Sequence, residues 1–80
     1  MKTIDICQDV IAERQRQDGK WGGPEHDDQW SPLDWHEMIA DYNAWARRMW
    51  AMGSREKARR RLVQVAALAI AAVESIDRVA

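Results

Sequence analysis

Residues 31–78 read SPLDWHEMIADYNAWARRMWAMGSREKARRRLVQVAALAIAAVESIDR, and this stretch decides the fold. It opens with a set of residues typical of a helix start. Ser31 can act as the N-cap, Pro32 suits the first helical position, and Asp34 places a carboxylate where a capping box needs it. Apolar residues then recur with helical spacing, which predicts a helix over residues 32–52.

The end of this helix and the start of another are marked by adjacent residues. Gly53 is typical of a helix C-terminus, because glycine adopts the left-handed conformation that follows the last turn. Ser54 can cap the next helix directly, and we predict that helix over 55–78. A connection this short forces the two helices into an antiparallel hairpin.

Both predicted helices carry an apolar face. The face of helix 32–52 is broad and consists of Trp35, Ile39, Tyr42, Trp45, Ala46, Met49 and Met52. In helix 55–78 the residues predicted to be buried are Leu62, Val65, Ala66, Ala69, Val73 and Ile76. The small alanines would allow a neighbouring helix to come close.

A third helix is predicted upstream, over residues 4–18. Thr3 is a suitable N-cap, and Asp5 lies in the first turn, where the helix dipole favours negative charge. Asp18 and Gly19 are expected to stop the helix. Its apolar stripe consists of Ile4, Cys7 and Ile11, widened by Ile6 and Val10.

Residues 19–31 connect this helix to the hairpin. The segment contains three glycines and one proline among Trp21, His26 and Trp30, which predicts a loop anchored by aromatic side chains. We find no internal repeat. The sequence therefore predicts a single all-α domain over residues 1–80.

The net charge of −1 hides a strong polarity along the chain. Residues 1–46 carry ten acidic and four basic side chains, whereas residues 47–80 carry three acidic and eight basic ones. The two parts thus have charges of −6 and +5 by direct count. They can neutralise each other within the fold, or they can form separate surfaces that attract partners.

Length and composition limit the class of protein. A chain of 80 residues buries a small core, so we expect a homodimer, with both hairpin helices contributing to the interface. No apolar run reaches the roughly 20 residues that span a bilayer. One cysteine and no signal peptide indicate the cytoplasm, and Cys7 is expected to be a buried thiol.

Five segments of the chain are distinctive: Glu13-Arg14-Gln15-Arg16-Gln17, Lys20-Trp21-Gly22, His26-Asp27, Arg61-Leu62-Val63-Gln64-Val65-Ala66-Ala67 and Glu74-Ser75-Ile76-Asp77-Arg78. Together they resemble small phage-encoded proteins of the MazG-like group. The resemblance covers nearly the whole chain. It implies an all-α fold completed by dimers or tetramers, and a nucleotide pyrophosphohydrolase that binds Mg²⁺ through Glu-Glu-x-x-Glu and Glu-x-x-Asp motifs.

The chain departs from the family's metal ligands. Only Asp41 remains of the first acidic motif, and Arg61 and Gln64 fall on the second. An arginine repels a divalent cation, which needs oxygen ligands. Glu37 lies one turn before Asp41 on the same face, so these two carboxylates are the candidates for a remnant Mg²⁺ site.

Two further features carry possible chemistry. A metal site made of His26, Asp27, Asp28, His36 and Glu37 matches no standard spacing, and a solvated acidic loop is the favoured interpretation. A basic cluster could bind the phosphate groups of nucleic acid or nucleotides, or it could be a solvated face. It consists of Arg55, Lys57, Arg59, Arg60 and Arg61, with Arg47 and Arg48 across the turn.

Three functions fit these residues. The preferred one is a noncatalytic phage protein, such as an inhibitor of a host defence complex of the anti-CRISPR kind, with no cofactor. Its predicted partner-binding residues are Trp21, Glu25, Asp27, Asp28 and Trp30, although the tryptophans could instead cap the protein's own core. The alternatives are a Mg²⁺-dependent pyrophosphohydrolase and a module that binds or sequesters nucleotides.

Overall fold

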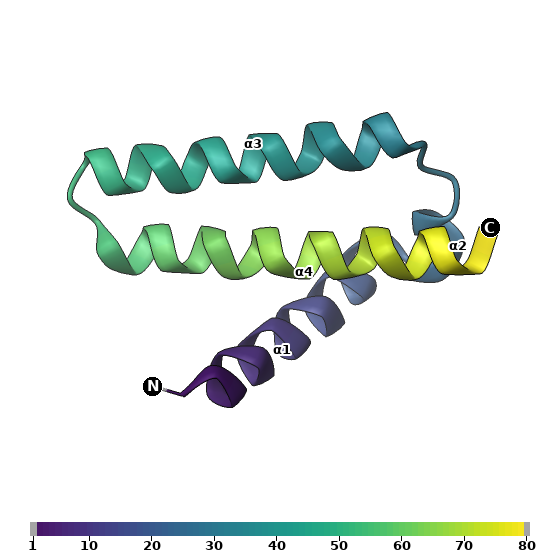
Figure 1. The fold of residues 1–80 in the computed structure, drawn as a ribbon, viewed down its shortest axis with the longest axis horizontal. Coiled ribbons are helices and arrows are strands. Elements are labelled where there is room, and N and C mark those ends of the chain that lie inside the picture. Colours follow the sequence, from purple (N-terminus) through teal and green to yellow (C-terminus); the bar gives the residue numbers. More distant parts are fainter. Residues whose placement is uncertain (1, 80) are drawn as a thin grey trace.

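The computed structural model describes residues 2–79 as an all-helical chain (Figure 1). The elements are α1 (Thr3–Trp21), α2 (Pro24–Asp27), α3 (Pro32–Ala51) and α4 (Arg55–Val79). The predicted all-α class is confirmed. The segment predicted as a loop over 19–31 is more ordered than expected, since it contains the last turn of α1 and all of α2.

Helices α3 and α4 form the predicted antiparallel hairpin (Figure 1). The Ser31 hydroxyl accepts a hydrogen bond from the Asp34 backbone N–H, and the Asp34 carboxylate accepts one from the Ser31 N–H at 2.8 Å. At the other end Gly53 has φ +79°, and the Ser54 N–H donates to the carbonyl of Met49. These caps satisfy backbone groups that the helix ends would otherwise leave without partners.

The core lies between α3 and α4. Trp35 and Tyr42 from α3 pack with Leu68 and Ala71 from α4. Residues packed around this cluster are Trp21, Trp30, Met38, Ile39, Val65 and Ala72. Most of the other buried apolar residues are alanines (Ala46, Ala58 and Ala67), which lets the helices approach closely.

The face of α4 that packs on α3 differs from the predicted one. The structure buries Ala58, Gln64, Ala67, Leu68, Ala71 and Ser75. Of the predicted set, Leu62, Val73 and Ile76 are 41%, 56% and 54% exposed. The prediction was wrong because α4 is apolar in more than one direction, and α3 occupies the side with the smaller residues.

On α3, the buried residues are Trp35, Tyr42 and Ala46, as predicted. Two other residues of the predicted face, Trp45 and Met52, are exposed instead. Met52 lies beyond the last residue of α3, at its C-cap, where α4 no longer covers it.

Helix α1 begins and ends differently from the prediction. Lys2 is its N-cap, and Thr3 is the first helical residue; the Asp5 carboxylate accepts the Lys2 N–H at 3.1 Å. Gly19 does not stop the helix, because glycine lowers helix stability by only about 1 kcal/mol. The helix ends at Trp21, and Gly22, at φ +104°, donates its N–H to Asp18.

Helix α1 crosses α4 at an angle, and its N-terminal end projects away from the hairpin (Figure 1). Val10 and Gln17 are its buried residues. Ile4, Cys7 and Ile11 lie on the exposed side, so the predicted buried thiol is instead exposed. The reason is that α1 covers α4 with another of its sides. Within residues 2–79 no helix is long and apolar enough to cross a membrane.

Candidate functional site

Arg61 and Gln64 bind each other where the MazG-like resemblance would place metal ligands. The Arg61 guanidinium donates to Gln64 Oε1 at 3.0 Å. It also lies over two aromatic rings of α3, 4.8 Å from the centroid of Trp45 and 5.9 Å from that of Tyr42. A cation held by a side-chain amide and two ring faces disfavours a divalent ion at this position.

The remnant carboxylates are brought together as the spacing predicts. Glu37 and Asp41 line one groove on α3, with a volume of about 360 Å³, together with Trp30, Asp34 and Met38. We call this the acidic groove. Glu37 and Asp41 are exposed, and neither forms an ion pair with any other residue in the range 2–79. Asp34 is used in the cap of α3.

Metal ligands are sparse in the described part of the chain. Residues 2–79 contain no group of three or more His, Cys, Asp or Glu side chains that could hold a metal ion. The alternative site built from His26, Asp27, Asp28, His36 and Glu37 is therefore not assembled there. Two carboxylates can hold a partly hydrated Mg²⁺ when a phosphate supplies further ligands, so the acidic groove is the remaining candidate.

Helix α1 carries a polar network that the sequence analysis missed. Arg16 binds Glu13 through two hydrogen bonds of 2.8 and 2.7 Å, and Gln17 donates to the same carboxylate at 3.1 Å. The hydrogen bond to Glu13 raises the pKa of Arg16, although desolvation opposes the shift. The spacing of three and four residues from Glu13 was the available signal.

Gln17 is the unusual member of this network. It is only 1% exposed, and its Oε1 has no hydrogen-bond partner among residues 2–79. A buried carbonyl oxygen without a donor costs about 1–3 kcal/mol unless water reaches it. The side chain contributes its amide to Glu13, so its role is to fix that carboxylate.

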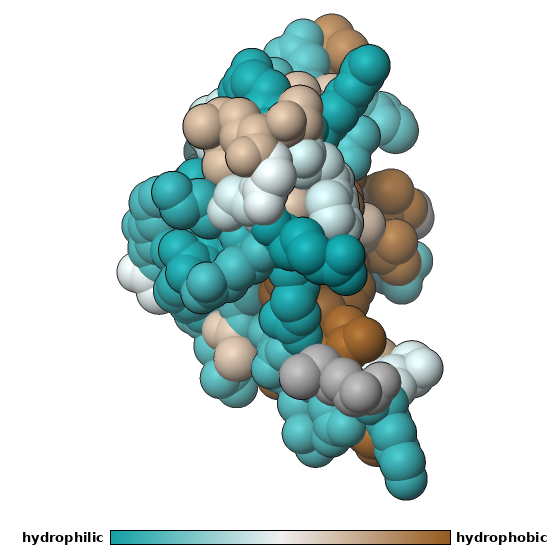
Figure 2. All heavy atoms as spheres, turned by 90° about the vertical axis from the view of Figure 1, so that its left-hand side faces the viewer, coloured by the Kyte–Doolittle hydropathy of each residue, from teal (hydrophilic) through white to brown (hydrophobic). Residues whose placement is uncertain are grey.

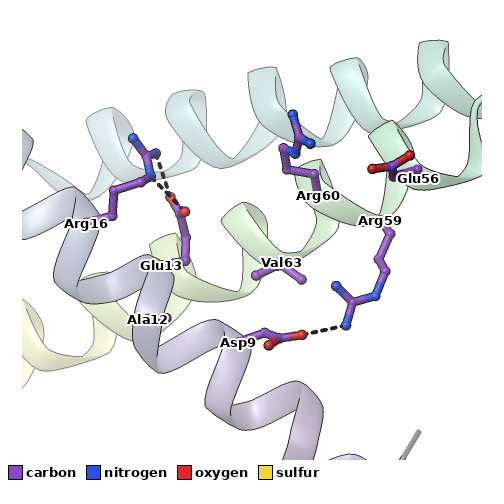
Figure 3. Close-up of a pocket in the computed structure, with 8 residues that line it drawn as sticks. All are labelled: Asp9, Ala12, Glu13, Arg16, Glu56, Arg59, Arg60 and Val63. Atoms are coloured by element: carbon purple, nitrogen blue, oxygen red, sulfur yellow. Dashed lines mark hydrogen bonds and ion pairs between the residues drawn. The ribbon is translucent and has the colours of Figure 1, made fainter.

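The side chains of the basic cluster contact different neighbouring residues. The guanidinium of Arg55 lies 5.6 Å from the ring centroid of Trp50, and Arg59 binds Asp9 at 2.7 Å. Figure 3 shows the Arg59 and Arg60 side chains leaving α4 in different directions, in a groove of about 400 Å³ that Glu13 and Arg16 also line. The five predicted residues therefore do not form one continuous basic face.

The acidic segment near α2 is largely engaged within the molecule. Asp27 is only 4% exposed, with Oδ1 3.2 Å from His26 Nδ1 and Oδ2 4.0 Å from an Arg14 nitrogen. Asp28 accepts hydrogen bonds from Arg78 at 2.8 and 3.1 Å and from Ser75 at 2.9 Å. Of the three predicted carboxylates, Glu25 is the exposed one.

The loop tryptophans pack against the protein's own core. Trp21 and Trp30 are half-buried, with ring centroids 6.4 Å apart, and Trp30 lies 4.7 Å from Trp35. His26 completes the group at 5.2 Å from Trp30. This placement agrees with the interpretation that the tryptophans cap the core, and it leaves only part of each ring for a partner.

The Asp28–Arg78 contact predicts a loss of stability in acid. The Arg78 hydrogen bond lowers the pKa of Asp28 below its ordinary value of 3.8. The contact therefore stabilises the fold above that value and is lost as the pH falls through the lower folded-state pKa. We expect Asp28→Asn to reduce the free energy of unfolding at pH 6 and to reduce it less at pH 2.5, measured by urea denaturation. Equal losses at both pH values would contradict this.

No known protein family, curated protein or solved structure matches this chain in the comparisons made with each. The resemblance to MazG-like proteins therefore stays a prediction based on the segments quoted above.

Proposed function

We propose that this chain is a noncatalytic protein that acts by binding a macromolecular partner. The observation that carries the proposal is the Arg61–Gln64 contact. A Mg²⁺-dependent pyrophosphohydrolase needs carboxylates that hold the ion and the substrate phosphates. Here the two positions hold a cation and an amide that satisfy each other, so the chain keeps a helical scaffold without the second half of the ligand set.

The acidic groove is the surface that best suits a partner. Its two free carboxylates, on Glu37 and Asp41, lie beside Trp30 and Met38, which supply apolar contact area. Exposed Leu33 lies next to Asp34 in the first turn of α3. Such a combination favours a basic protein surface of the kind that binds nucleic acid, because opposite charges speed association and apolar groups stabilise the complex.

The specific form of this proposal follows from the resemblance. A phage-encoded inhibitor, acting in the host cytoplasm on a defence complex that processes nucleic acid, would need an acidic surface to occupy a basic channel. Compared with the sequence-based prediction, the contact moves from Asp27 and Asp28 to Glu37 and Asp41. The reason is that Asp27 is buried and Asp28 is bound to Arg78.

A second function is favoured by one observation. Glu37 and Asp41 share a groove without competing cations, so they could hold a hydrated Mg²⁺ bound to a nucleotide. A nucleotide-binding module, or a weak pyrophosphohydrolase, would use this groove too. Measurement of Mg²⁺-dependent nucleotide binding by calorimetry separates these functions from protein binding.

Neutralising the acidic groove should weaken partner binding. Immobilised protein would first capture its partner from bacterial extract, and the purified partner would then be titrated against variants. For Glu37→Gln with Asp41→Asn we expect affinity to fall by at least about tenfold, mainly through slower association and most clearly at low salt.

The matched control is Gln8→Lys with Gln15→Lys, two exposed positions on α1 that change the net charge by the same amount. It should leave the affinity within a factor of about two, because long-range steering alone is screened by salt. If the control weakens binding as much as the groove variant, the groove is not the contact. If the groove variant binds normally, the proposed surface is wrong.

A further inference from the structure

The isolated protomer is more open than a monomer of its mass should be. Its accessible surface is 5703 Å², whereas the usual relation for folded monomers gives about 5,000 Å² for 9.3 kDa. Its radius of gyration is 13.1 Å, against about 11.6 Å expected for 80 residues. The excess surface of about 700 Å² is close to the ~800 Å² that each partner buries in an interface of standard size.

The protomer's core is correspondingly small. Among residues 2–79, four of the eight buried apolar residues are alanines, and Leu68 is the one large apolar side chain that is fully buried. Eight larger aliphatic residues of α1 and α4 are exposed instead. They are Ile4, Ile6, Ile11, Leu62, Ile70, Val73, Ile76 and Val79. Seen from the hairpin turn, hydrophobic atoms gather along one edge of the molecule, while the opposite side is mainly polar (Figure 2).

Five residues of α4 form a regular stripe along the helix. Leu62, Ala66, Ala69, Val73 and Ile76 are separated by four, three, four and three residues, the spacing of a coiled-coil seam. We call these five residues the α4 seam. Their spacing places them on one side of the helix, whereas Leu68 and Ala71 face α3 and Val63 and Glu74 face α1. The seam is thus a third side of α4.

Near the N-terminal end of α4, residues of α1 extend the apolar surface of the seam. Ile6 and Val10 line a groove of about 170 Å³ together with Leu62, Val63 and Ala66 of α4. The lining is mainly apolar. A partner helix lying along the seam would therefore meet a shallow trough with α1 as one wall.

We propose that a second copy of this chain packs on the α4 seam, with the two α4 helices antiparallel and Ala69 at the two-fold axis. Ala69 lies at the middle of the seam, and its two largest residues, Leu62 and Ile76, lie seven residues away on either side. In this register Leu62 meets Ile76 of the partner subunit, Ala66 meets the partner's Val73, and Ala69 meets the partner's Ala69. Large residues thus meet at the ends, and the alanines allow close approach at the centre.

The charge distribution on α4 selects the antiparallel arrangement. Residues 55–61 hold five basic side chains and one acidic one, whereas residues 74–78 hold Glu74, Asp77 and Arg78. Parallel helices would bring the two basic ends together, and antiparallel ones bring each basic end near two carboxylates. The acidic groove lies on α3 and is not part of the seam, so this assembly does not depend on the proposed function.

The oligomeric state tests the proposal directly. Sedimentation at micromolar concentration should give twice the 9.3 kDa protomer mass. Ala69→Arg places two guanidinium groups against each other at the axis and should raise the dimer Kd at least about a hundredfold. Ala44→Arg, the same change at an exposed position on α3, should leave the dimer intact. A wild-type protein that sediments only as the protomer would overturn the proposal.

Cysteine cross-linking tests the register, with Cys7→Ser as background. Leu62→Cys and Ile76→Cys should each stay uncross-linked alone and should form a covalent dimer when mixed and oxidised. The reason is that two copies of residue 62 lie about 20 Å apart in the antiparallel seam, too far for a disulfide. A disulfide formed by Leu62→Cys alone would overturn the antiparallel arrangement. No cross-link in the mixture would overturn the seam, even if the protein is a dimer through another face.

Discussion

Replacing Trp35 by alanine should lower the free energy of unfolding by about 3–5 kcal/mol, the usual effect of removing a buried aromatic side chain. Trp35 is 5% exposed, packs on Leu68 and Ala71, and supports Trp30 at 4.7 Å. Domains of this size are stable by only about 5–15 kcal/mol, so the loss is a large part of the total. Urea denaturation followed by far-ultraviolet circular dichroism measures it.

The matched control is Trp50→Ala. Trp50 is 48% exposed at the end of α3, and the guanidinium of Arg55 lies over its ring at 5.6 Å from the centroid. Its removal should cost no more than about 1 kcal/mol, the value of an exposed cation–π pair. Both variants must be compared at one protein concentration, because self-association adds to the apparent stability. Similar losses for the two tryptophans would mean that the core is not where the α3–α4 packing places it.

In a pyrophosphatase assay, we expect a large difference between this protein and an active pyrophosphohydrolase. Purified protein with saturating Mg²⁺ and each nucleoside triphosphate should release no pyrophosphate above the uncatalysed rate. The physical reason is the Arg61–Gln64 pair, which takes the place of the second acidic motif. The acidic groove then offers the carboxylates of Glu37 and Asp41, because that of Asp34 is used in the cap of α3. Typical enzymes turn over about 1–10³ times per second, so the assay separates the two outcomes by many orders of magnitude.

One result of this assay would show that the protein is an enzyme after all. Turnover at an enzymatic rate that disappears with Asp41→Ala, while the fold is retained, would show that two carboxylates suffice with the substrate's phosphates. Asp77→Ala, the same change at an exposed carboxylate on α4, is the control for a contaminating phosphatase. Activity that survives both substitutions would come from a contaminant.

The hairpin could be predicted from the sequence because its determinants are local. Ser31 and Asp34 start α3 through reciprocal hydrogen bonds, with Pro32 at the first helical position, and Gly53 follows its end with a positive φ. Such signals need no knowledge of the rest of the fold. The all-α class followed from them together with the helical spacing of the apolar residues.

The buried side of α4 could not be predicted in the same way. The 4-3-4-3 spacing of Leu62 to Ile76 is the more regular apolar pattern, yet the structure buries Leu68 and the smaller residues around it against α3. Periodicity identifies faces that need a neighbour, but it does not say which neighbour takes which face. Cys7 was misplaced for the same reason, since α1 uses another side to cover α4.

In the candidate site too, some features follow from the local sequence and others depend on how the helices pack. The adjacency of Glu37 and Asp41 follows from one helical turn, and the structure places both in the acidic groove. The burial of Asp27 and the position of Arg61 over two rings of α3 depend on which helices pack together, so no local sequence pattern predicts them. The Arg14–Glu74 contact likewise joins side chains 60 residues apart.

The short connection between α3 and α4 also bears on the order in which the molecule can assemble. Closing a loop of three residues costs little chain entropy, so the hairpin can form early and on its own. Helix α1 can dock only after α4 exists, because its contacts reach Arg59 near one end of α4 and Glu74 near the other. We therefore expect the hairpin to form first during folding and the N-terminal helix to join it later.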